Sequence, residues 1–338
     1  MSTTKQEHFV PNFYLKKFAN LALSKNENED KYIEVFDKKE QRMFSSNTKK
    51  LAKDGRFYDF PIELFGENDK IFDKLLQRYE EIIAPFYKKF ETKLSYIINL
   101  DNKQKSQIKA IKKMEKKYWS YILAIQALRT PEFRNFINEV KQKAANENIT
   151  QEFLEKKSSE EIEKIKTSYP ELNSAFTKDF LIETTLNIIN ILHDEFMPIT
   201  HHNFFVNHLH DLSKIFVKHK WIVGVNQTEI PFYTSDHPIV KIPYFQTGYA
   251  SDGIEILFPI NSKFVLVLRD KKHPKSYEGD CKLVVLSEDE VNNYNKAQVY
   301  CSNRFIFCQK KSFELVQEIC KQEPDVCSGV KDRMKFIK

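Results

Sequence analysis

The sequence predicts an α+β protein in which a helical middle region packs against a mainly antiparallel sheet built from N- and C-terminal strands. Residues 1–66 mix short strands and turns, residues 67–218 place apolar side chains at helical spacing, and residues 219–322 return to extended patterns. We expect one compact unit over 1–338, with a poorly ordered tail at 323–338. The 28 Phe and 15 Tyr residues are sufficient for a well-filled core.

The N-terminal region opens with an aromatic segment, from His8 to Phe18. It lacks the basic start and apolar run of a signal peptide and is too aromatic for a disordered tail, so we expect it to fold into the body of the protein. Residues 32–36 alternate as a strand does. Residues 42–44 are expected to pair with them as a hairpin across the polar turn 37–40.

The middle region shows the periodicity of helices. Five main helices are expected, over about residues 68–94, 102–128, 131–145, 180–196 and 203–217. A short exposed helix is also expected within the charged residues 146–175. Pro85 should kink or divide the first helix. Thr130 and Pro131 end the second, and Pro198 separates the last two.

The C-terminal region alternates strands with short helices. Strands are expected at residues 221–225, 239–242, 254–258, 264–268, 282–286 and 304–307. Helices are expected at 288–297, with Ser287 as its N-cap, and at 312–320.

Composition limits the function classes. The chain holds 7 Gly and no Gly-rich phosphate-loop motif, which argues against a nucleotide-binding loop. The net charge of +6 permits an anionic partner such as nucleic acid without demanding one. The five Cys residues, all in the last quarter, show no C-x-x-C spacing, and an odd number does not make a disulfide framework, so we expect a reducing cytoplasm. No apolar run is long enough for an ordinary transmembrane helix, so no membrane partner is expected, and the oligomeric state stays open.

The helix end at residues 126–131 is the first candidate site. Gln126 and Arg129 share the apolar face that carries Trp119 and Ile122. A buried guanidinium requires a carboxylate, a carbonyl or an anionic ligand. Arg129 is therefore either a structural tie or a ligand-binding group. We favour the tie, with Arg129 holding the loop of Ser235 and Asp236 in place.

The second candidate is the loop 234–238, which contains Ser235 and Asp236 between two strands. Asp236 and His237 could serve as base, acid or metal ligand. Alternatively, Ser235 and Asp236 bond local amides in a turn. Ser235 lacks the G-x-S-x-G setting of a hydrolase nucleophile.

The third candidate is His8, whose ordinary pKa lies near neutrality. It could shuttle protons or bind a ligand, or simply donate to a backbone carbonyl. Asp59 and Glu63 lie four residues apart and could join His8 in a metal site, or could instead begin a helix. Together with Asp236 they are the predicted ligands for Mg²⁺ or Mn²⁺.

These segments carry a family resemblance. The opening segment 8–18, the helix end 126–131, the loop 234–238, the segment 257–260 and the Asn-rich stretch 292–295 occur in the order typical of one bacterial family. The chain resembles the family known as domain of unknown function 4238. The resemblance implies no established reaction. It singles out these segments as candidate sites, and it implies an association with mobile or defence-associated proteins.

We therefore expect five residues to converge at one cleft: His8, Gln126, Arg129, Ser235 and Asp236. The leading hypothesis is a nuclease-like phosphodiester hydrolase acting on nucleic acid. Arg129 would hold phosphate and His8 would transfer the proton, while Asp236 with Asp59 or Glu63 would hold a metal or activate water. The alternative is a non-catalytic binding or regulatory module whose polar cluster is structural. A small-molecule enzyme would instead show a deep pocket lined by aromatic residues.

Overall fold

The computed structural model describes residues 6–23, 30–60, 70–101, 103–104, 108–146, 197–243 and 248–328. It is an α+β protein, as the sequence predicts. Where the sequence predicts one unit, the contacts divide the chain into two. The first unit comprises Met1–Phe57, Asp73–Pro131 and Phe205–Lys338, and the second comprises Tyr58–Phe72 and Glu132–Phe204.

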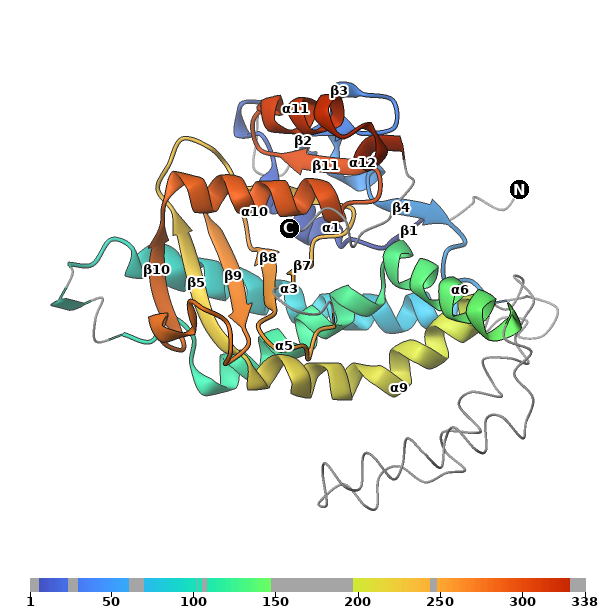
Figure 1. Cartoon of the computed structure of the whole chain (residues 1–338), viewed down its shortest axis with the longest axis horizontal. Helices are drawn as coiled ribbons and strands as arrows, with labels where there is room; N and C mark the ends of the chain where they lie inside the picture. Colours follow the sequence, from blue (N-terminus) through green and yellow to red (C-terminus); the bar gives the residue numbers. More distant parts are fainter. Residues whose placement is uncertain are drawn as a thin grey trace, which may run out of the picture. The chain divides into compact units, whose positions relative to one another are not determined.

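A five-stranded sheet forms the core of the first unit (Figure 1). Its order is β10-β5-β9-β8-β7, and of these pairs only β10 with β5 is parallel. The strands are β5 (Lys220–Asn226), β7 (Val240–Ile242), β8 (Glu255–Pro259), β9 (Phe264–Arg269) and β10 (Lys282–Leu286). Gly224 is needed in β5, because a Cβ there would lie 2.7 Å from side-chain atoms of Leu286 and Val265.

Helices cover both faces of this sheet. Helix α10 (Glu288–Cys301) packs Val291 and Tyr294 onto one face, where Leu257 is buried. The next residue, Phe258, faces the opposite side and contacts Trp119 of α5 (Lys113–Leu128), with ring centroids 6.2 Å apart. Figure 1 shows α5 and α3 (Ile71–Ile97) on the side of the sheet away from α10.

A second sheet joins N- and C-terminal strands. Its antiparallel order is β3-β2-β11-β6. The strands are β2 (Tyr32–Asp37), β3 (Arg42–Asn47), β6 (Thr234–Ser235) and β11 (Phe305–Cys308). Helices α11 (Glu314–Gln322) and α12 (Pro324–Ser328) contribute Val316, Ile319 and Val326 to the apolar cluster that contains Phe36 and Ile306. As predicted, strands from the N-terminal and C-terminal regions pair in one sheet. The described strands form three sheets, however, rather than the single sheet that we expected.

The N-terminal segment adds a two-stranded ribbon of β1 (Gln6–His8) and β4 (Lys53–Gly55). Short helical turns connect it to the second sheet: α1 (Asn12–Leu15), η1 (Lys16–Phe18), η2 (Leu21–Leu23) and η3 (Thr48–Lys50). A further turn, η7 (Ser276–Glu278), precedes β10.

Two predicted helix boundaries are wrong. Helix α5 begins at Lys113 rather than at residue 102, because Ala110 donates its amide to the carbonyl of Cys281 and the Glu115 side chain accepts from the Lys112 amide. Helix α9 (Met197–Lys218) includes Pro198 in its first turn, where a missing amide costs no hydrogen bond. The helix expected over residues 180–196 lies outside the described residues.

The expected break in the first long helix and the expected poorly ordered tail also differ from the structure. Pro85 lies inside an uninterrupted α3. The predicted tail begins with α12, and a disulfide joins Cys320 to Cys327. The described part of the chain therefore contains a disulfide that the odd number of Cys residues did not predict.

The described part of the second unit has an aromatic core. Tyr58 packs against Phe72 and against His201, with ring centroids 4.8 and 5.9 Å apart, and Phe133 of α6 (Pro131–Asn146) contacts His201 at 5.7 Å. No helix among the described residues is long and apolar enough to cross a membrane.

Candidate functional site

The end of α5 holds the N-terminal segment in place. Gln126 donates from Nε2 to the carbonyl of Phe9 at 3.1 Å, and Arg129 donates from Nη2 to the carbonyl of His8 at 2.6 Å. Arg129 is only 2% exposed and forms an ion pair with Glu80 of α3 at 2.8 Å. This pair supplies the opposite charge that a buried guanidinium requires. Glu80 is thus one acidic partner of Arg129, and among the described residues no ion pair joins Arg129 to Asp236, the residue whose loop we expected it to hold.

His8 lies beside Lys53, its direct cross-strand partner in the β1–β4 ribbon. Its Nε2 lies 3.2 Å from the carbonyl oxygen of Lys49. Because a carbonyl only accepts, Nε2 carries the hydrogen, and Nδ1 keeps a lone pair with no hydrogen-bond partner in the described part of the chain. The imidazole is half-buried, so one nitrogen is fixed and the other is open.

The charge state of His8 follows from its surroundings. Burial lowers its pKa below the ordinary 6.5, and the positive charges of Lys53 and Arg129 lower it further, while Glu80 opposes the shift. The ring is therefore neutral at neutral pH. A neutral imidazole with an open nitrogen is the form that accepts a proton.

Ser235 and Asp236 perform structural roles in the loop after β6. Asp236 is 3% exposed and accepts three backbone amides: Asn303 on Oδ1 at 2.7 Å, and Arg304 and Phe305 on Oδ2 at 2.7 and 3.0 Å. Its carboxylate therefore orders the turn that joins α10 to β11. Ser235 accepts the His237 amide at 3.1 Å, as the turn hypothesis predicts.

Helix α10 binds the same loop through two amide side chains that lie three residues apart. Gln298 accepts the Ser235 hydroxyl at 2.9 Å and donates to the Pro238 carbonyl at 3.0 Å. Asn295 accepts the Tyr233 amide at 2.8 Å and donates to the Pro231 carbonyl at 3.0 Å. The Asn-rich stretch 292–295 is visible in the sequence, but its pattern does not show this role. The signal was an amide pair at helical spacing on a face that is otherwise apolar.

The five predicted residues take part in two sets of hydrogen bonds. His8, Gln126 and Arg129 meet at the N-terminal segment, while Ser235 and Asp236 bond to α10 and to the turn at 303–305. Thr130, which follows Arg129, and His237, which follows Asp236, contact each other, with Thr130 Oγ1 and His237 Nδ1 3.4 Å apart. Within the described chain, no side-chain hydrogen bond joins Ser235 or Asp236 to the first set.

Two of the three predicted metal ligands lie among the described residues, each in a different unit. Asp59 belongs to the second unit, whereas Asp236 belongs to the first, and Glu63 lies outside the described residues. Both oxygens of Asp236 accept amides. Among the residues that the structure describes, no group of three His, Cys, Asp or Glu side chains is arranged to hold a metal ion.

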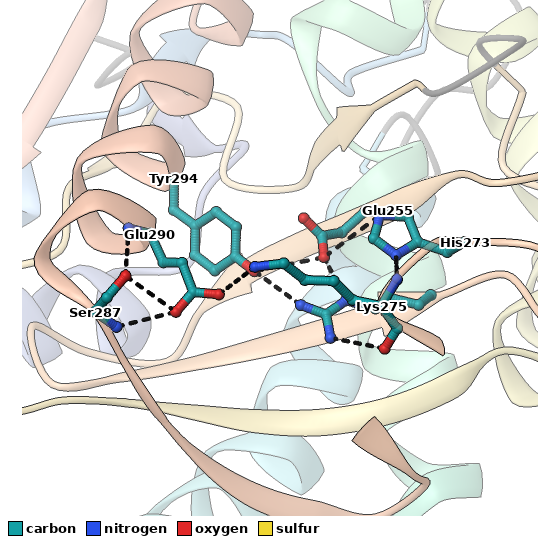
Figure 2. A network of polar contacts seen from close by, with 7 residues as sticks. Glu255, His273, Lys275, Ser287, Glu290 and Tyr294 are labelled. Atoms are coloured by element: carbon teal, nitrogen blue, oxygen red, sulfur yellow. Dashed lines mark hydrogen bonds and ion pairs between the residues drawn. The ribbon is translucent and has the colours of Figure 1, made fainter. Parts of the chain in front are cut away.

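A network of charged side chains near the start of α10, buried at Arg269 and Glu255, was not predicted from the sequence (Figure 2). Arg269, 2% exposed, donates from Nε to Glu255 Oε2 at 2.5 Å, and its Nη2 lies 3.3 Å from the Tyr294 hydroxyl. Lys275 continues the network to Glu290 at 2.5 Å. Glu255 and Arg269 are cross-strand partners in β8 and β9, so they satisfy each other and fix α10 to the sheet. The sequence signal was a single Glu inside the apolar run 254–258.

A polar cavity of about 460 Å³ opens where β5 ends. Its lining includes Asn226, Gln227, Ser262, Lys263, Gln309 and Lys310. This cavity is not the deep aromatic pocket that a small-molecule enzyme hypothesis requires.

The fold and these polar groups define an α+β protein whose opening segment is clamped by the end of a buried helix. The chain belongs to the family described as protein of unknown function (DUF4238), whose model matches residues 6–312. The match covers the N-terminal segment, the end of α5, the loop after β6 and α10. Comparison with the curated proteins and with the solved structures found no match.

Proposed function

We propose that the protein cleaves phosphodiester bonds of nucleic acid, with His8 as the group that accepts the proton. The observation that supports this is the state of the His8 ring: Nε2 is fixed by the Lys49 carbonyl, and Nδ1 is open in a neutral ring beside the cationic Lys53. An oriented neutral imidazole is the most common general base in enzymes. A neighbouring cation favours the approach of a phosphate.

Gln126 and Arg129 act in this proposal as positioning residues. They hold the carbonyls of Phe9 and His8, and so fix the backbone that carries the imidazole. Arg129 also adds positive charge near His8. Ser235 and Asp236 maintain the loop and do not contact the substrate.

Cleavage assays with matched variants test the proposal. Labelled RNA, single-stranded DNA and double-stranded DNA are incubated with the protein in Mg²⁺, in Mn²⁺ and in chelator. His8→Ala should lower the rate about 100-fold or more. His210→Ala, which changes an exposed His on α9, should leave the rate unchanged. Cleavage that His8→Ala does not affect would overturn the proposal, as would a wild-type protein that cuts none of the substrates.

A second candidate is a non-catalytic binding or regulatory module. It is favoured by the contacts of the motif side chains, because Gln126, Ser235 and Asp236 all bond to backbone or to buried amides. Fluorescence anisotropy with the same nucleic acids distinguishes the two. Binding without cleavage by the wild-type protein supports the module.

We also propose that the protein works in the bacterial cytoplasm. Cys281 and Cys308 are buried thiols, as a reducing compartment allows. The Cys320–Cys327 disulfide is the observation against this location. Thiol labelling of protein taken directly from cells tests the location, since a reduced Cys320 supports the cytoplasm.

A role in defence follows from the resemblance alone, and plaque counts on phage-challenged cells with and without the protein test it.

A further inference from the structure

We infer that the substrate is single-stranded RNA and that the attacking group is its own 2′-hydroxyl, which leaves a 2′,3′-cyclic phosphate and a 5′-hydroxyl. This inference rests on the proposed phosphodiester cleavage. It is carried by one juxtaposition: His8 and Lys53 lie opposite each other on the same face of the β1–β4 ribbon.

The ribbon places a base and a proton donor at a suitable separation. Directly opposed residues of an antiparallel pair have Cβ atoms about 4.5–5.5 Å apart, and both side chains point to the same face. His8 presents its open Nδ1, and the Lys53 ammonium forms no ion pair among the described residues. Two long or planar side chains on this spacing can reach both sides of one phosphate.

The reaction balances with these two groups. His8 Nδ1 takes the proton of the 2′-hydroxyl while O2′ forms a bond to phosphorus, and the bond from phosphorus to O5′ breaks. Lys53 gives a proton to O5′ as it leaves. Exchange with water then removes the proton from His8 and returns one to Lys53, so no oxidant or reductant takes part.

A single base is sufficient because RNA carries the nucleophile in place. An intramolecular attack avoids the entropic cost of positioning a water molecule. DNA lacks the 2′-hydroxyl, so the same two groups would not cleave it. In-line attack also requires a backbone that can rotate, which favours a single strand over a duplex.

Basic residues in and beside β4 extend the site. Lys49, Lys50, Lys53 and Arg56, which we call the basic strip, lie within eight consecutive positions around β4. Lys50 and Arg56 are exposed and have no ion-pair partner in the described chain. Lys49 pairs with Asp30 at 2.6 Å, but both side chains are about half exposed, so the pair is weak. The basic strip can therefore contact phosphates next to the one that is cleaved.

Three substrates of one sequence test the inference: single-stranded RNA, the same RNA with 2′-O-methyl groups, and single-stranded DNA. The wild-type protein should cut only the first, and mass spectrometry should find a cyclic phosphate on the product. If DNA or methylated RNA is cut at a comparable rate, the 2′-hydroxyl inference is overturned while phosphodiester cleavage stands. If no substrate is cut, the proposed function fails and the inference fails with it.

Variants separate the acid from the phosphate contacts. Lys53→Ala should lower kcat about 100-fold, as loss of a proton donor does. Lys50→Ala and Arg56→Ala should instead raise KM and reduce the salt dependence of binding by about one counterion each. Lys39→Ala, in the exposed β2–β3 turn, is the matched control and should change nothing. A Lys53→Ala variant that changes only KM would show that Lys53 is not the acid.

Discussion

The carboxylate of Asp236 offers a strict test of its structural role. It accepts three backbone amides while only 3% exposed, so these donors have little access to water. Asp236→Asn replaces one oxygen with a donor, which must face at least one amide. An unsatisfied buried donor costs about 1–3 kcal/mol, and hydrogen bonds to a neutral acceptor are weaker than those to a charged one. We therefore expect Asp236→Asn to lower the free energy of unfolding by about 2–4 kcal/mol.

Asp236→Ala should cost more, about 3–6 kcal/mol, because all three amides lose their acceptor. Urea denaturation followed by circular dichroism measures both variants beside wild type. Glu229→Gln is the control, since its side chain is fully exposed, and it should unfold as wild type does. If Asp236→Asn unfolds like wild type yet abolishes activity, the carboxylate acts on the substrate and the structural assignment is refuted.

Three further predictions follow from the same structure. Arg129→Ala should lower the free energy of unfolding by roughly 2–4 kcal/mol, because Glu80 and the His8 carbonyl both lose their partner; unchanged denaturation would show that neither contact matters. Breaking the disulfide with Cys327→Ser should cost at most about 2.5 kcal/mol, since the two cysteines are only seven positions apart and close a short loop; a larger loss in a calorimetric melt would contradict this. Because the pKa of His8 is lowered in the folded protein, the unfolded chain binds the proton first as pH falls through 6.5, and the free energy of unfolding should decrease on acidification. Urea titrations at several pH values should show a smaller decrease for His8→Ala than for wild type.

Local signals predicted much of the fold correctly. The β2–β3 hairpin follows from the alternation of residues 32–36 and the polar turn after them, although β3 extends to Asn47, beyond the predicted residues 42–44. The N-cap of α10 follows from Ser287 and Glu290, which bond each other's amides. Each of these features depends on residues within about fifteen positions of one another, so the sequence pattern contains the whole interaction.

Features that depend on distant partners were not predictable in this way. The start of α5 is set by Cys281, whose carbonyl accepts the Ala110 amide and holds that segment out of the helix. The alternation of the C-terminal strands shows which side chains are buried, but it does not show that β11 lies between β2 and β6. The sequence could therefore predict the strands but not their division into sheets.

In the candidate site, too, the sequence predicted local features but not distant partners. Burial of Arg129 on an apolar helix face predicted that it needs a partner, and the structure supplies one. Its identity as Glu80 could not be predicted, because many acidic residues were equally available in the sequence. The amide acceptors of Asp236 were hidden for another reason: its donors are backbone groups of residues 303–305, which carry no side-chain signal.

The pH dependence of RNA cleavage tests the central claim, that His8 accepts the proton, most directly. Because its pKa lies below 6.5, the acid limb of kcat/KM should fall below that pH, with full activity retained near neutrality. His8→Ala should remove the limb and lower the rate at least about 100-fold. A His8→Ala variant that cleaves RNA at the wild-type rate, with the same acid limb, would contradict the account.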